Sequence, residues 1–241
     1  GKLSQEKITY KRIALSVPRG GAGLGDYTGA ASDLFNNMRA PAALVGGSIV
    51  PMGFAATPEP NANDSKFIKR LKLLHMIIAI LSLSSEIIAV TYSTVAINKL
   101  SESIIAPTTS VTVLLKRDFE LQWLGCNVNF LLGLLGFASM LGIRAWIVFG
   151  PKIGKISILA VGSVISHCLS VINHGISHGD GSGSGSGTFG SNFFGIIKRY
   201  FHLTTSETLK NKGILQFAAF GFLAASLYFY SKTSPDDTSV Q

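Results

Sequence analysis

One stretch between Leu73 and Ile97 decides the fold, and it reads LLHMIIAILSLSSEIIAVTYSTVAI. At about 1.5 Å of rise per residue, a helix over these residues reaches roughly 37 Å. That length exceeds the roughly 30 Å of a bilayer's hydrocarbon core. We therefore predict a transmembrane helix over residues 73–97.

The composition extends this interpretation to the whole chain. Of the 241 residues, 47% are hydrophobic and only 14% are charged, whereas about a quarter is usual in soluble domains. Further apolar runs occupy residues 127–149, 156–174 and 214–230. The fold class predicted is an all-α membrane protein with about four transmembrane helices and a long irregular N-terminal arm, which excludes a soluble enzyme.

Changes in composition divide the chain into five parts. Residues 1–62 are rich in Gly, Pro and Asn and are predicted to form an extended arm. Residues 63–178 carry three of the transmembrane helices, and residues 179–191 form a Gly/Ser-rich loop. Residues 192–232 combine an interfacial helix, over 193–203, with the fourth transmembrane helix. Residues 233–241 form a polar tail.

The arm contains two segments of its own. Residues 26–39 have the pattern of a short helix, and residues 40–56 are apolar but are interrupted by Gly46, Gly47, Pro51 and Gly53. A span with so many breaks is not expected, because irregular backbone at membrane depth must be covered by protein. We expect this segment to lie on the membrane or to dock against another subunit.

Charge is the next guide to partners and orientation. The net charge is +8, and many basic residues fall within the first 72 positions. This pattern suits an anionic bilayer surface or an acidic protein partner, and it is also a positive-inside signal. The basic arm places both termini on the cytoplasm-like side. The run KRDFE at 116–120 is expected at the water interface, with its charges paired locally or with a neighbour.

Four polar residues within or beside the apolar runs are the candidate cofactor-binding residues: His75, Glu86, His167 and His174. Neutral imidazole ligates metals, including the magnesium of chlorophyll and the iron of haem. The alternative is that each group hydrogen-bonds to a neighbouring helix. His174 and His178 also have a metal-ligand spacing, but the chain has only 5 histidines and no HEXXH motif.

Glu86 and His167 both fall near the middle of their predicted helices, so they are expected to share a depth in the bilayer. A buried carboxyl at that depth needs a partner. We expect Glu86 to hydrogen-bond to His167 or to a neighbouring helix, or to help ligate a pigment magnesium. A membrane transporter or channel would use the same two residues.

The sequence lacks the motifs of the common enzyme classes. GGAGLG at 20–25 is not followed by GK[ST], and there is no GxSxG elbow. Cys126 and Cys168 fall in different apolar runs and are expected to be buried, unpaired thiols. The absence of a leader at Gly1 suggests an organelle protein that has already been processed. No catalytic residue is therefore expected.

Three segments carry a resemblance: SSEIIAVTYSTVAINKL at 84–100, LLKRDFELQW at 114–123 and FLLGLLGFASMLGIRAW at 130–146. They resemble a group of multi-pass plastid membrane proteins from algae with secondary plastids, diatoms among them. The resemblance implies a chloroplast thylakoid location and a role as an accessory subunit of a photosystem. The repeated glutamate and arginine helix motif of light-harvesting proteins is absent.

We therefore expect a non-catalytic accessory subunit of a thylakoid complex that binds chlorophyll and carotenoid. Its partners would be lipids and other subunits of a photosystem core or antenna, and no nucleic acid is expected. A small membrane transporter or channel is the first alternative. A photosystem assembly factor, bound only transiently, is the second.

Overall fold

The computed structural model describes residues 23–55, 61, 63–178, 189 and 192–211, together with 218–219, 221–222, 224–226 and 228. Within these residues the chain is helical, with one isolated backbone bridge between Gly25 and Thr108 and no strand. The elements are α1 (Thr28–Ile49), the π-helix η1 (Val50–Ala55), α2 (Lys66–Glu102), α3 (Val111–Asp118), α4 (Glu120–His178) and α5 (Phe193–Asn211). The all-α prediction is confirmed for the described residues.

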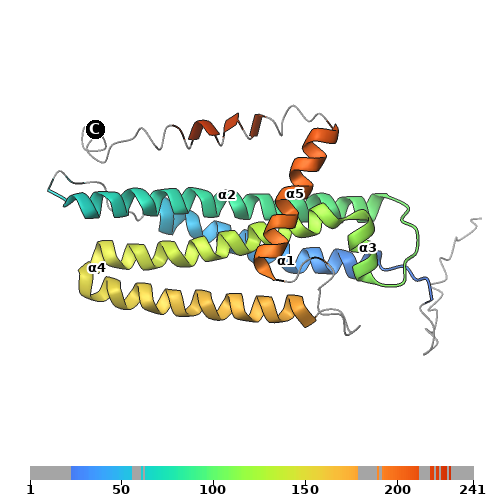
Figure 1. Cartoon of the computed structure of the whole chain (residues 1–241), viewed down its shortest axis with the longest axis horizontal. Coiled ribbons are helices and arrows are strands. Elements are labelled where there is room, and N and C mark those ends of the chain that lie inside the picture. The colour runs from blue at the N-terminus through green and yellow to red at the C-terminus, as the bar shows by residue number, and fades with distance from the viewer. Residues whose placement is uncertain are drawn as a thin grey trace, which may run out of the picture.

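Two of these helices, α2 and α4, are long and apolar enough to cross a membrane. α4 is itself a hairpin, because Gly150 has the non-helical angles φ 81° and ψ −177° and is followed by Pro151. The predicted turn at these two residues is confirmed. We call residues 120–149 the inner arm of α4 and residues 151–178 the outer arm. Figure 1 shows the chain reversing at this turn, so that the two arms lie antiparallel.

The elements begin where the sequence supplies capping groups. The Ser65 hydroxyl accepts a hydrogen bond from the backbone N–H of Ile68 at the start of α2, and Ser110 does the same for Val113 at the start of α3. Such caps satisfy N–H groups that have no partner inside the helix. At the start of α1, Asp26 accepts from the backbone N–H of Thr28. This hydrogen bond lowers the pKa of Asp26.

The short helix predicted over residues 26–39 is confirmed as the first part of α1, whereas the irregular conformation predicted for the next segment is wrong for residues 40–55. These residues continue α1 through Pro41 and then form η1 around Pro51. Packing explains the difference, since α1 buries Ala31, Phe35 and Ile49 along one face, and tertiary burial outweighs the weak helix propensity of Gly and Pro. Figure 1 shows α1 lying along α2. The first 22 residues of the arm lie outside the described part.

The remaining predicted helices fall inside longer ones. Residues 73–97 lie within α2, and residues 127–149 and 156–174 lie within the two arms of α4. The interfacial helix predicted over 193–203 is α5, which continues to Asn211 and packs on the inner arm through Tyr200, Leu124 and Val128. Most of the predicted fourth helix, 214–230, lies outside the described residues, as does most of the loop 179–191.

Candidate functional site

The interior of the bundle is organised by one face of α2, which we call the inner face. Its buried residues recur at alternating spacings of three and four, the period of a coiled-coil seam. Small side chains dominate this face, as they do between closely packed membrane helices. Two titratable groups, His75 and Glu86, lie among them. The nine residues are Lys72, His75, Ala79, Ser82, Glu86, Ala89, Ser93, Ala96 and Leu100.

Glycines on the neighbouring elements receive the larger side chains of α2. A Cβ at Gly125 would lie 2.6 Å from a ring carbon of Tyr92, and one at Gly53 of η1 would lie 2.7 Å from the Cβ of Ala79. A Cβ at Gly133 would overlap the carboxyl group of Glu86. Contacts this short leave no room for a side chain at these positions. The close approach of α1, α2 and the inner arm therefore depends on glycine.

Glu86 is enclosed between two helices. Its side chain is 1% exposed, and it passes Gly46 of α1, where an added Cβ would lie 3.3 Å from the Glu86 Cβ, to reach Gly133 of the inner arm. Neither carboxyl oxygen has a hydrogen-bond partner among the described residues. Such groups are costly to bury and are uncommon in folded proteins. Glu86 is the strongest candidate for a functional group inside the bundle.

A shallow groove of about 330 Å³ runs beside Glu86 between α1 and α2. Its walls are apolar except for Thr91, whose hydroxyl donates to the backbone carbonyl of Ile87 at 2.8 Å. The carboxyl of Glu86 points away from this groove, toward Gly133. A ligand in the groove would meet the stem of Glu86 and not its oxygens, so the groove offers no polar anchor.

His75 is also completely buried on the inner face. Arg144 of the inner arm lies close enough to influence it electrostatically, and the Arg144 guanidinium donates a 2.7 Å hydrogen bond to the backbone carbonyl of Met52 in η1. A pigment ring has no access to His75 unless the helices separate. The sequence prediction did not include the hydrogen bond between Arg144 and Met52. The available signal was Pro51 and Gly53, which interrupt the apolar pattern at the place where the π-helix forms.

His167 and His174 lie elsewhere, on the outer arm of α4, and both are exposed. His167 takes part in no hydrogen bond among the described residues. Around it, Leu159, Val164 and Val171 expose 74%, 57% and 57% of their surface. The side chain of His178 is not among those that the structure describes. Among the residues that it does describe, no group of three or more metal-binding side chains occurs.

The predicted pair of Glu86 and His167 is not formed. Val161 of the outer arm packs on Gly142 of the inner arm. Because the arms are antiparallel, His167, six residues after Val161, lies level with Gly136, six residues before Gly142. Gly136 in turn packs on Ser82, which is one helical turn from Glu86. The two residues therefore lie at a similar level along the bundle. They do not meet, because the inner arm lies between them.

The two thiols are free. The predicted burial is confirmed for Cys126 and is wrong for Cys168, which is half-buried. The Ser93 hydroxyl lies 2.8 Å from the Cys126 sulfur, linking α2 to the inner arm. The predicted local pairing in KRDFE is also confirmed. Arg117 forms an ion pair with Asp118 at 2.7 Å, and Glu120 pairs with Arg199 of α5.

The candidate residues thus form two sets. His75 and Glu86 are enclosed in the bundle, whereas His167 and His174 face outward from it. Comparison with known proteins adds no assignment to either set: no protein family, curated protein or solved structure matches this chain.

Proposed function

We propose that this chain is an integral membrane protein and a non-catalytic accessory subunit of a larger thylakoid complex, a photosystem, where it holds a few pigments. The observation that carries the proposal is the outer arm of α4. Its outward face exposes large apolar side chains, among them Ile156, Leu159 and Val164, and bears His167 without a partner among the described residues. A helix with these properties requires a lipid or protein environment that the described chain does not supply.

The position of His167 indicates which groups that environment must contain. A polar group in hydrocarbon is costly unless it is paired. An imidazole facing outward at mid-span can ligate a chlorophyll magnesium or hydrogen-bond to a neighbouring subunit. Either partner comes from outside this bundle. His174 stands one to two turns further along the arm and belongs to the same outward surface.

Four antiparallel segments cross the membrane in this proposal: α1 with η1, α2, and the two arms of α4. Gly53 packs against Ala79 and Gly46 against Glu86, so α1 and η1 traverse the same depth as the apolar part of α2. Their outward side chains Leu44 and Met52 are exposed and apolar. The breaks in this segment are tolerated because α2 and Arg144 cover them.

The thylakoid location and the photosystem rest on the resemblance of residues 84–146 to plastid membrane proteins. Native-gel separation of gently solubilised source membranes tests both. Co-migration of the tagged chain with a pigmented complex is expected. A free small band would contradict the proposal, and co-migration with immature particles alone would favour an assembly factor.

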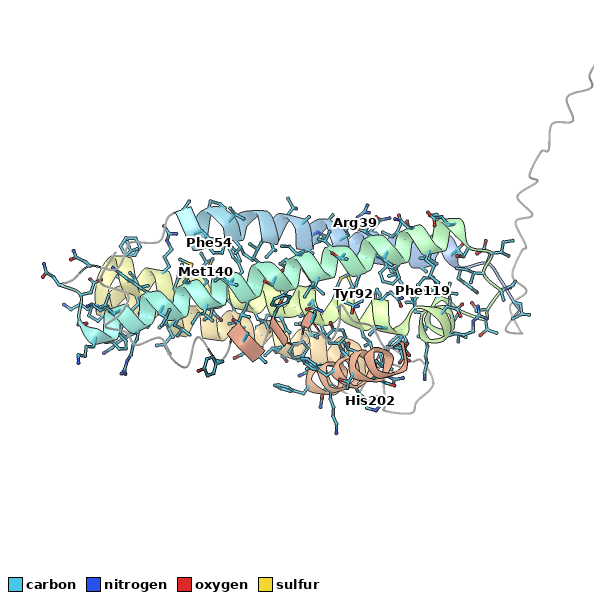
Figure 2. All side chains as sticks on the ribbon, turned by 90° about the horizontal axis from the view of Figure 1, so that it is seen from above. Arg39, Phe54, Tyr92, Phe119, Met140 and His202 are labelled. Atoms are coloured by element: carbon cyan, nitrogen blue, oxygen red, sulfur yellow. The ribbon has the colours of Figure 1, made fainter. Side chains whose placement is uncertain are left out.

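A matched pair of histidine variants tests the outer arm itself. His167→Leu removes the imidazole and keeps an apolar surface, so the variant should lose pigment or co-migration with the complex. His202→Leu makes the same change at an exposed position of α5 and should leave both unchanged. Figure 2 shows His202 on α5, on the opposite side of the bundle from α1. Equal behaviour of the two variants would overturn the role of His167.

A second candidate function, a proton-coupled transporter, is favoured by Glu86. A buried carboxyl without a hydrogen-bond partner is typical of groups that bind and release protons in membrane carriers. The decisive measurement is proton flux in reconstituted vesicles. Flux that is abolished by Glu86→Gln at unchanged abundance would support the carrier, and absence of flux in the native chain would exclude it.

A further inference from the structure

The two ends of the bundle differ in how their positive charges are used. At one end, the start of α2 and the hairpin turn of α4 come together (Figure 1, left). We call this the basic end. The one acidic residue described there is Asp64. Its basic residues are Lys66, Lys69, Arg70, Lys72, Arg144, Lys152 and Lys155.

Aromatic packing joins the two elements of the basic end. The rings of Phe67 in α2 and Trp146 in the inner arm meet edge to face, with centroids 5.8 Å apart. A Cβ at Gly154 would lie 2.6 Å from Trp146, so the outer arm begins directly against the same indole. The cations of α2 and of the outer arm therefore belong to one continuous surface.

Two of the seven cations are already occupied. Lys72 forms a 2.6 Å ion pair with Asp64, and Arg144 donates to the carbonyl of Met52. The other five form no ion pair among the described residues. Four of them are exposed and Lys69 is half-buried. This end thus presents a cluster of positive charge that the described residues leave uncompensated.

At the opposite end of the bundle, several cations are paired with groups of the same chain. Arg117 pairs with Asp118, and Arg199 pairs with Glu120. The Lys99 ammonium lies 5.1 Å from the centre of the Phe119 ring, a cation–π contact. The exposed Lys116 and Lys198 have no ion pair there among the described residues, so the two ends differ in degree: most of the described cations at the basic end lack an ion pair, whereas Lys99, Arg117 and Arg199 at the opposite end have partners in the chain.

We propose that the basic end binds anionic lipid headgroups of one membrane leaflet, through their phosphate or sulfate oxygens. Phe67 is 53% exposed beside Trp146, and aromatic side chains of this kind favour the boundary between headgroups and hydrocarbon. Lysines that border an apolar span reach toward the same layer. A lipid headgroup therefore satisfies both the charge and the depth. The inference rests on the membrane embedding proposed above.

The two tryptophans of the chain allow each end to be tested separately. In the variant Trp123→Phe, Trp146 alone reports on the basic end. Its fluorescence would be measured in vesicles containing brominated phosphatidylglycerol or brominated phosphatidylcholine. We expect stronger quenching by the anionic lipid, with an affinity preference of about fivefold for each lysine engaged, weakening with added salt.

Matched charge variants identify the residues responsible. Lys152→Gln with Lys155→Gln should lower the preference by up to about 25-fold, about fivefold for each lysine removed, whereas Lys116→Gln with Lys198→Gln at the opposite end should leave it intact. Equal quenching by both lipids in the native sequence would overturn the headgroup proposal while leaving membrane embedding in place. Absence of quenching by either lipid would instead overturn the embedding itself, so the two failures are distinguishable.

Discussion

The inner face of α2 and the outer arm of α4 are both apolar helical surfaces with titratable residues, yet they are packed in opposite ways. On the inner face, Glu86 is enclosed against Gly133, and small residues bring three helices into close contact. On the outer arm, His167 and its apolar neighbours are exposed. Hydrophobicity alone therefore does not distinguish a completed interface from an open one. The glycines on the opposing helix do.

The largest effect is expected from placing a side chain where that close contact occurs. Gly133→Leu would force Leu into the space of the Glu86 carboxyl and should destabilise the bundle by about 3 kcal/mol or more. Unfolding in mixed detergent micelles, followed by circular dichroism, measures this. The control is Gly162→Leu on the outer arm, where an added Cβ meets nothing within 4 Å. Equal destabilisation by both variants would show that the outer arm is packed as tightly as the inner face.

Substituting Glu86 should give the next largest change in the free energy of unfolding, and this change should be a stabilisation. Because neither oxygen has a partner among the described residues, Glu86→Met removes a buried polar group without leaving a donor unpaired. Methionine is unbranched and follows the same path beside Gly133. We expect stabilisation of about 1 to 3 kcal/mol in the same unfolding measurement. A loss of stability would show that Glu86 is held by a group outside the described chain.

A smaller effect is expected where α5 joins the bundle. The Tyr200 hydroxyl accepts a 3.2 Å hydrogen bond from the Asn129 amide, which also donates to the backbone carbonyl of Gly125. The hydroxyls of Tyr200 and Tyr92 also hydrogen-bond to each other. Tyr200→Phe should therefore cost about 0.5 to 1.5 kcal/mol, toward the upper end because two partners lose a bond. Protease cleavage between α4 and α5 should accelerate slightly. Complete loss of α5 protection would mean that the bonds of this one hydroxyl hold the helix.

The long helices were predictable because their signals are local. Continuous apolar runs fixed α2 and both arms of α4, and Gly150 with Pro151 fixed the hairpin. The short helix over 26–39 was predictable too, but its continuation through the rest of α1 was not, because Pro41, Gly46 and Gly47 locally favour irregular backbone, and only packing against α2 makes the helix favourable there. The similar level of Glu86 and His167 along the bundle followed from counting residues. Their separation did not, because it depends on which arm of α4 packs inside.

The smallest effect concerns Lys72, the outermost residue of the inner face, whose charge is balanced by Asp64. The hydrogen bond from Lys72 lowers the pKa of Asp64 below its ordinary value of 3.8. A carboxyl whose pKa is depressed in the folded state contributes stability above the unfolded pKa, and that contribution is lost as the pH falls through the folded value.

The native chain should therefore lose a small increment of stability below about pH 4 that Asp64→Asn lacks. Asp64 is partly exposed to solvent, so the increment will be modest and will shrink with added salt. Thermal unfolding at pH 3 and pH 6 measures it, with Lys152→Gln on the outer arm as the control that should retain the native pH dependence. If Asp64→Asn and the native chain show the same pH dependence of thermal unfolding, the ion pair between Lys72 and Asp64 does not contribute to stability.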